Sequence, residues 1–156
     1  MGPSALCAVG AWRDAAHMNA TPKAELEVIP EWECLRLLQT RQIGRLAFVV
    51  GNQPLVLPVN YTVNDGTIVL RTGLGAKLAN APLTKVAFEV DDIDETSREG
   101  WSVLVQGVGQ DITTGIDPSS ERLRALAPQP WAGGEREHYI RVVPREISGR
   151  RVHDGR

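Results

Sequence analysis

The chain has 156 residues, of which 42% are hydrophobic and 23% charged, with a formal net charge of −2. A chain of this length forms one ordinary globular domain around a single core. The nearly balanced charge offers no basic field for nucleic acid. No apolar run reaches the roughly 20 residues of a transmembrane helix. Nucleic-acid and membrane partners are therefore not expected.

The first 26 residues are small, polar and without periodicity. They lack the basic segment and the long apolar run of a signal peptide. Residues 1–26 are expected to be a disordered leader ahead of a domain at 27–156. Met18 offers an alternative start, which leaves open whether residues 1–17 belong to the native protein. The protein is expected to be cytoplasmic.

Cysteine and histidine are too scattered to indicate a metal centre. Cys7 and Cys34 have neither a disulfide pattern nor ligand spacing. Cys34 lies in a predicted helix, where a small buried apolar residue is the simpler interpretation. No second ligand at helical spacing accompanies any of the three histidines, His17, His138 and His153.

The first predicted element is an amphipathic helix in PEWECLRLLQTRQIG, residues 30–44. Pro30 suits the first turn, and Gly44 ends the helix. Trp32, Leu35 and Leu38 are expected to share its buried face.

Segments rich in β-branched residues follow this helix and predict strands. Asn64-Asp65-Gly66 predicts a tight hairpin, because primed turns need residues that tolerate positive φ. Pro58 interrupts the strand before that turn, which indicates an edge position, a bulge or a broken ladder. Helices are expected near 76–81 and at 118–127, the second capped by Asp117. The predicted strands are 45–50, 54–63, 67–72, 84–92, 101–113 and 137–144. Six short strands and two or three peripheral helices predict a mainly β fold, a six-stranded antiparallel barrel.

The segment Arg71–Lys77 is the sharpest local feature of the sequence. Arg71 offers a bidentate cation, Thr72 a hydroxyl and Lys77 a point charge, while the glycines between them free backbone N–H groups. These groups suit a phosphate. The alternative is a solvated loop whose cations pair with the acidic stretch at 89–95.

The order of the elements resembles that of a known family. A helix, GRLAF, PVNYTVNDGTIVLRT, GLGAK, KVAFEVDD and GWSVLVQG stand in succession. This set is similar to the pyridoxamine 5′-phosphate oxidase-like flavin-binding split barrels, in particular the small bacterial and actinobacterial branch with nitroimidazole-resistance-type relatives. The resemblance covers residues 29–152 and depends on the ordered set, since no single motif is specific. It implies a split β-barrel that forms a homodimer with two cofactors at the interface.

The resemblance also implies roles for particular residues. Thr72 and Lys77 match the positions that hold the flavin phosphate, and Arg71 is placed to assist. The backbone that would lie along the isoalloxazine ring belongs to Pro58, Val59, Asn60 and Tyr61.

Three further residues are implied from the later part of the chain. Ser102 stands where the true oxidases carry a glutamine that contacts the flavin, and Trp101 precedes it. Trp131 is the candidate for a second wall supplied by the partner subunit. The alternative for both tryptophans is a place in the core or at the dimer interface.

The sequence departs from the oxidases proper. The strand LVLPVNYTV has neither their arginine nor their lysine, so oxidation of pyridoxamine phosphate is not expected. No nucleophile–base pair or carboxylate pair is evident and no catalytic residue is assigned, which fits chemistry carried by a cofactor. The expected function is reduction of a small organic or nitro-type substrate with FMN.

Two alternatives stay open. The same barrel can host the deazaflavin coenzyme F420, whose phosphate would also reach Lys77. The protein can instead store or sense flavin or haem without turnover, and His138 is then the candidate haem ligand.

Overall fold

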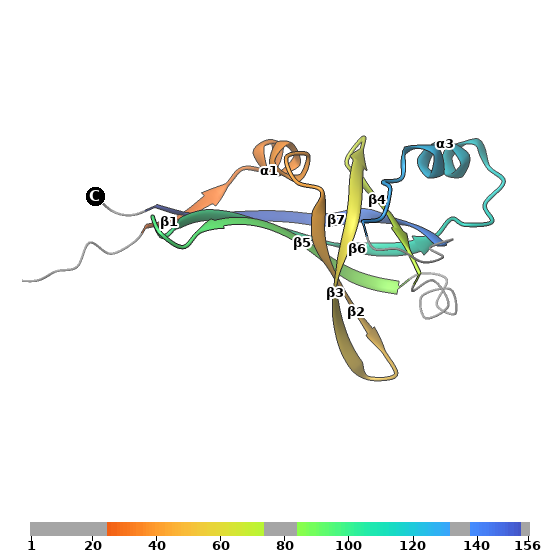
Figure 1. Ribbon diagram of the computed structural model, residues 1–156, viewed down its shortest axis with the longest axis horizontal. Helices are drawn as coiled ribbons and strands as arrows, with labels where there is room; N and C mark the ends of the chain where they lie inside the picture. Colours follow the sequence, from red (N-terminus) through yellow and green to blue (C-terminus); the bar gives the residue numbers. More distant parts are fainter. Residues whose placement is uncertain (1–24, 74–83, 132–137, 154–156) are drawn as a thin grey trace, which may run out of the picture.

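The computed structural model describes residues 25–73, 84–131 and 138–153. Most of the described chain is strand, as Figure 1 shows. The expected short helix near 76–81 lies outside the described residues. The elements are β1 Glu25–Ile29, α1 Glu31–Leu38, β2 Ile43–Val50, β3 Gln53–Asn64, β4 Thr67–Thr72, β5 Thr84–Asp94, β6 Glu99–Asp111, α3 Pro118–Leu126 and β7 His138–His153.

The strands form one antiparallel sheet that closes on itself. The strand order is β1-β7-β4-β3-β2-β5-β6, and an additional pairing joins β6 to β7. The six strands from β7 to β6 therefore make the predicted barrel. The seventh strand, β1, pairs with the far end of β7, from Glu25 opposite His153 to Ile29 opposite Gly149. The predicted leader boundary at residue 26 falls inside this strand, which the aperiodic composition did not reveal.

The first helix is shorter than predicted and turned differently. It ends at Leu38, and its buried residues are Cys34, Leu37 and Leu38, while Trp32 is exposed. Gly44 does not end the helix but lies in β2, where an added Cβ would come within 2.3 Å of the Phe88 ring. Its glycine is thus explained by close packing of two strands and not by helix termination.

The second described helix agrees with the sequence. The Asp117 side chain accepts a hydrogen bond from the Ser120 backbone N–H, as an N-cap does. α3 covers a small cluster outside the barrel, made by Val69, Ile112 and Leu123. The larger core fills the barrel itself, and α1 packs its buried face against it. None of the helices in the described part of the chain is long and apolar enough to cross a membrane.

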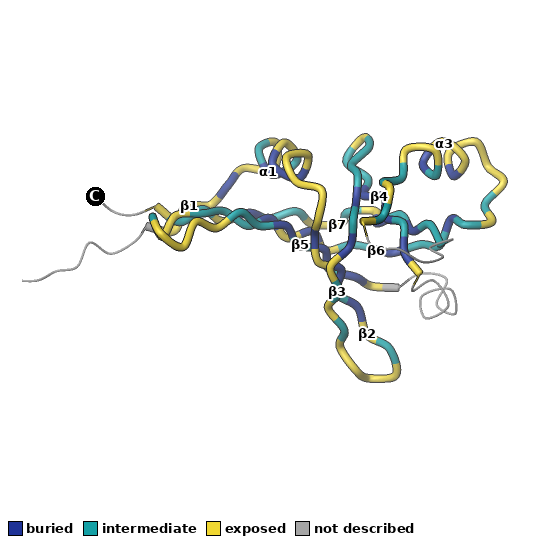
Figure 2. The backbone as a smooth tube through the Cα atoms, viewed as in Figure 1, coloured by how far each residue is buried: buried dark blue, intermediate teal, exposed yellow. Residues whose placement is uncertain are grey.

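The β2–β3 hairpin projects away from the rest of the sheet (Figure 1). Figure 2 shows that its tip is exposed, whereas the strands around the core are buried. Both tight turns have positive φ at two residues, Gly51-Asn52 and Asp65-Gly66, which confirms the predicted hairpin at 64–66. The pairing of β3 with β4 begins at Tyr61. Pro58 lies before that point and pairs with Arg45 of β2 on the other side of the strand. Among the described strands, Pro58 thus occupies an edge, one of its predicted placements.

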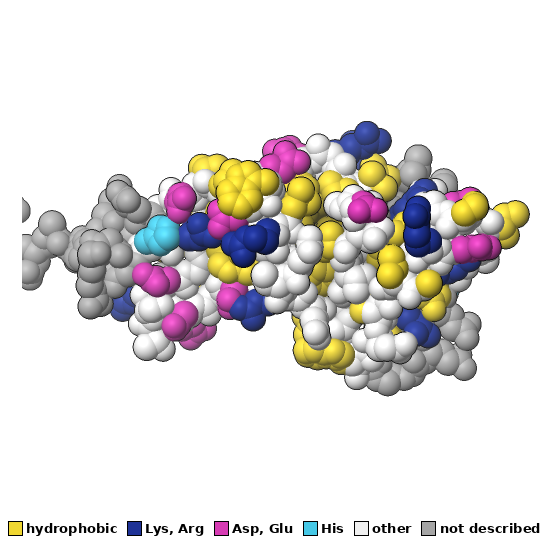
Figure 3. Space-filling view, turned by 90° about the horizontal axis from the view of Figure 1, so that it is seen from above, with side chains coloured by type: hydrophobic (Ala, Val, Ile, Leu, Met, Phe, Trp, Pro, Cys, Tyr) yellow, Lys and Arg dark blue, Asp and Glu magenta, His cyan; other side chains and the backbone are white. Residues whose placement is uncertain are grey.

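A charged cluster fastens the β1 end of the molecule. An Arg151 guanidinium nitrogen lies 2.6 Å from a Glu33 carboxylate oxygen and joins β7 to α1. His153 Nε2 lies 2.8 Å from Glu27 Oε2 and joins β7 to β1. Basic and acidic side chains gather at this end in Figure 3. The Arg151 hydrogen bond holds the pKa of the Glu33 carboxyl below its usual range.

Tyr61 is the main polar residue inside the barrel core. Its side chain is 3% exposed, and its hydroxyl donates to the Leu38 carbonyl oxygen at 2.5 Å, which ties α1 to β3. Its ring meets the Phe88 ring edge-on at 4.9 Å between centroids. Burial raises the pKa of Tyr61 to about 12.

This burial makes stability depend on alkaline pH. A tyrosine in the unfolded chain ionises near pH 10, whereas folded Tyr61 stays protonated to about pH 12. Its contribution is therefore complete below pH 10 and is lost as pH rises from 10 to 12. We expect the free energy of unfolding to fall by roughly 2 kcal/mol across that window, measured by urea denaturation at fixed pH values.

Replacing the hydroxyl separates this effect from general alkaline denaturation. Tyr61→Phe is expected to lose about 1 kcal/mol at neutral pH, because the Leu38 carbonyl loses its donor, and to remove the fall above pH 10. Tyr139→Phe keeps the Tyr61 hydroxyl and serves as the control. An equal alkaline fall in wild type and Tyr61→Phe would contradict the assignment.

Candidate functional site

The end of β4 carries the first two residues of the predicted phosphate segment. Arg71 and Thr72 are neighbours in a strand, so their side chains point to opposite faces of the sheet. Thr72 shares the inner face with Leu70 and is 1% exposed. Arg71 lies on the outer face, with its guanidinium carbon 5.4 Å from the Tyr139 ring centroid. Lys77 lies outside the described residues.

The strand predicted to follow a flavin ring runs beside this end of β4. Tyr61 pairs with Leu70, so Asn60 lies next to Arg71 along the two strands. Val59 and Tyr61 point into the barrel core. Pro58 and Asn60 alternate with them and face outward. A ligand on the outside of β3 would therefore meet its backbone and the side chains of Pro58 and Asn60.

Asn60 fixes two other segments in place. Its Nδ2 donates to the Gln42 carbonyl oxygen at 3.3 Å, and its Oδ1 accepts from the Trp131 backbone N–H at 3.0 Å. The segment 128–131 thus lies over β3 of its own chain and encloses a cavity of about 360 Å³ with Gln42 and Thr62. Trp131 was predicted to form a wall of the partner subunit's cofactor site. In the structure it lines this cavity of its own chain and remains 68% exposed.

Trp101 and Ser102 lie at the opposite end of the barrel. They pair with Arg151 and Arg150 on β7, whereas Thr72 pairs with His138. Twelve residues of strand separate His138 from Arg150, which corresponds to roughly 40 Å. Within one chain the structure brings Asn60, Arg71, Thr72 and Trp131 to one region and does not bring Trp101 or Ser102 there.

The two residues of that distant pair face opposite sides. Trp101 packs against the main core and lines a cavity of about 340 Å³ with Asp92, Arg151 and His153. Ser102 is paired with Asp91 on β5 and Arg150 on β7 and shares the face that points away from the core.

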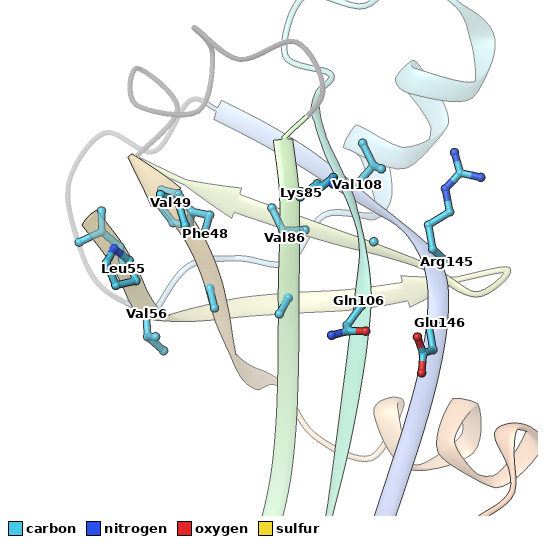
Figure 4. Close-up of a pocket in the computed structure, with 14 residues that line it drawn as sticks. Phe48, Val49, Leu55, Val56, Lys85, Val86, Gln106, Val108, Arg145 and Glu146 are labelled. Carbon is cyan, nitrogen blue, oxygen red and sulfur yellow. The ribbon is translucent and has the colours of Figure 1, made fainter. Parts of the chain in front are cut away.

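That outward face of β1, β2, β5 and β6, together with the β3 arm of the hairpin, is called the open face below. The described helices pack elsewhere, α1 against β7 and β6 and α3 against β3 and β4. A broad cavity of about 690 Å³ lies on the open face. Figure 4 shows Val49 and Val56 on one side of it and Arg145 and Glu146 on the other. Large exposed apolar residues recur across the open face, namely Val28, Val49, Val56, Ile93 and Leu104.

The acidic stretch at 89–95 pairs with arginines of the neighbouring chain segments. Arg45 Nη1 lies 2.9 Å from a Glu89 carboxylate oxygen and 3.0 Å from one of Asp91, and these ion pairs raise the pKa of Arg45. Arg41 pairs with Asp92. These contacts involve Arg41 and Arg45, and Lys77 of the alternative pairing lies outside the described residues.

The structure brings together two titratable residues, His138 and Asp111, whose proximity the sequence did not indicate. His138 Nδ1 lies 3.5 Å from Asp111 Oδ2 at the Thr72 end of the barrel. The sequence indicated His138 only as a haem candidate and did not indicate Asp111. The alternation of His138, Ile140 and Val142 was the available signal, because it places the histidine on the apolar inner face.

Comparison with known proteins identifies relatives of this arrangement. The family model for pyridoxamine 5′-phosphate oxidase matches residues 30–151. An uncharacterised protein of Mycobacterium tuberculosis, Rv0080, is 31% identical over 142 residues, which are 86% of this chain and 91% of that protein.

Solved structures agree with the family and the fold. A FAD binding protein from Mycobacterium smegmatis is 31% identical with a TM-score of 0.58, over 81% of this chain and 98% of that one. A FAD-binding protein from Mesorhizobium loti has a TM-score of 0.67 at 21% identity, over 83% and 98% of the two chains, and shows the shared fold. With the closed six-stranded barrel and the family match over most of its length, the chain belongs to the pyridoxamine 5′-phosphate oxidase family.

Proposed function

We propose that this protein is a flavin-dependent oxidoreductase that holds the phosphate of its cofactor at the end of β4 and reduces a small organic or nitro-type substrate. The observation that carries the proposal is the buried Thr72 hydroxyl at a strand end, directly before the segment that leads to Lys77. The relative from Mycobacterium smegmatis, 31% identical, is a FAD binding protein, which supports a flavin here.

The donor set suits a phosphate-bearing group. Thr72 offers a hydroxyl inside the barrel end, and Lys77 a cation five residues beyond Thr72, the last residue of β4. Arg71 stands on the outer face, so it would reach a phosphate around the strand end and not from the side of Thr72. Hydrogen bonds between cations and phosphate oxygens are among the stronger ones in proteins.

The chain's other residues would bind and orient. The edge backbone of Pro58 and Val59 would lie along the ring, and Asn60 would position the Trp131 segment through its hydrogen bond. Trp131 and the prolines before it would exclude water from the cavity over β3. A bound flavin supplies electron and hydride transfer, for which protein residues have no counterpart.

We propose further that the protein is a homodimer formed through the open face. Apolar residues spread over an uncovered sheet face are typical of interfaces. The projecting β2–β3 hairpin would pack against a second copy of the chain. Arg45 with Glu89 and Asp91 would supply polar contacts in the middle of this interface. Ser102 lies on this face, so a partner could bring it to the Thr72 end that its own chain keeps distant.

The phosphate contact is tested by comparing flavins with and without a phosphate. We expect purified protein to bind FMN, and Thr72→Val or Lys77→Ala to lower that affinity about 10- to 100-fold, the effect of losing a hydrogen bond to a charged group. Riboflavin, which has no phosphate, should bind the variants and the wild type alike. Flavin fluorescence quenching measures each affinity.

Thr67→Val is the matched control, because Thr67 begins the strand that Thr72 ends. FAD and the deazaflavin coenzyme F420 are titrated in parallel. Binding of F420 but not of FMN or FAD would favour the deazaflavin alternative. Tight flavin binding without reduction of any screened substrate by reduced nicotinamides would favour a storage or sensing protein. Equal FMN affinity in all variants would remove the phosphate site.

The interface is tested with charges on the hairpin. The double variant Val49→Asp, Val56→Asp is expected to shift the protein from dimer to monomer, because two carboxylates would have to be buried. Sedimentation velocity measures the shift. Ile116→Asp is the control, since Ile116 is 90% exposed in the loop before α3. A wild-type monomer, or a hairpin variant that stays dimeric, would contradict this interface.

A further inference from the structure

His138 stands in an unusual position for a histidine. It begins β7 directly opposite Thr72, and it alternates with Ile140 and Val142, which are 2% and 0% exposed in the barrel core. Directly paired residues share a face of the sheet. The imidazole and the Thr72 hydroxyl therefore lie side by side at one end of the barrel interior.

One ring nitrogen of His138 lacks a hydrogen bond to any described residue. Its Nδ1 atom is buried and has no hydrogen-bond partner within the described part of the chain. Asp111 Oδ2 lies 3.5 Å from it, within ion-pair distance but without hydrogen-bond geometry. Asp111 pairs with Ile140 on β7 and so shares the same inner face. A buried polar atom without a partner is rare in folded proteins and calls for an explanation.

A purely structural role accounts poorly for this pair. The next inner residues along β7, Ile140 and Val142, are apolar, and an aliphatic side chain at position 138 would fill the same space without a desolvation cost. The His138 side chain is 35% exposed, and Nδ1 does not belong to that exposed part. The ring therefore turns one nitrogen toward Asp111 and keeps another part of its surface accessible.

We infer that His138, oriented by Asp111, is a further contact of the phosphate that binds beside Thr72. A doubly protonated imidazole has a donor at each ring nitrogen, one for the Asp111 carboxylate and one for a phosphate oxygen. Nε2–H then donates to a phosphate oxygen, and Nδ1–H turns to Asp111. Asp111 is a positioning residue, because it acts through the imidazole. The inference rests on the proposed phosphate site at Thr72.

The first measurement is an NMR titration of the wild-type protein with inorganic phosphate, without any flavin. The ¹⁵N signals of the His138 imidazole, identified by their loss in His138→Gln, are expected to shift as phosphate is added. The signals of His153 should stay, because it lies at the other end of β7 beside Glu27. His138 signals that do not move with phosphate would overturn the contact.

The second measurement compares variants. His138→Gln is expected to weaken FMN binding about tenfold and to leave riboflavin binding unchanged. Asp111→Asn should weaken FMN binding about threefold and reduce the phosphate-induced shift of the imidazole signals, which a merely structural carboxylate would not do. His153→Gln is the matched control. Thermal unfolding of each variant reports whether the fold is retained.

The outcomes separate this inference from the proposed function. If Thr72→Val weakens FMN binding and His138→Gln does not, the flavin site stands and the histidine contact is wrong. If no flavin binds but phosphate moves the His138 signals, the proposed cofactor is wrong and the phosphate contact stands for another phosphorylated ligand.

Discussion

The pairing of β6 with β7 closes the barrel, and the positions of all candidate residues depend on it. The ladder runs from Gly100 opposite Val152 to Asp111 opposite Ile140 and contains a register shift at Gln106/Gly107. A Cβ at position 107 would come within 2.3 Å of the Val143 carbonyl oxygen, so the two strands approach at this point as only glycine permits. The shift lets two long strands bend around one core and still keep Asp111 on the inner face with His138.

The length of β7 separates the candidate residues into two groups, one at each end of the strand. One end pairs with β4 and carries Thr72 and His138, and the other pairs with β1 and carries the partners of Trp101 and Ser102. Side chains at both ends cannot touch one ligand in a single chain, since the strand is rigid along its ladder. A second copy bound to the open face would remove this separation. The proposed dimer would thus account both for the sheet face that the described helices leave uncovered and for the separation of the candidate residues.

Local features of the sequence predicted the fold well. The Asp65-Gly66 turn, the Asp117 cap and the strands of the barrel depend on residues close in sequence, and the structure confirms them. Gly44 and Trp32 were assigned wrongly because neighbours distant in sequence decide their surroundings. The β1 strand has no pattern of its own that sets it apart from the leader, because its partner is the other end of the chain.

The candidate site was less predictable than the fold for the same reason. Arg71 and Thr72 are adjacent in sequence and were predicted to act together, but strand geometry places their side chains on opposite faces. Asp111 and His138 are 27 residues apart, and only the register of β6 on β7 joins them. A phosphate at this strand end would therefore be met from inside the barrel by Thr72 and His138 and from outside by Arg71. Under this proposal, the run of polar residues at 71–77 contains only part of the candidate site, because the remaining contact comes from β7.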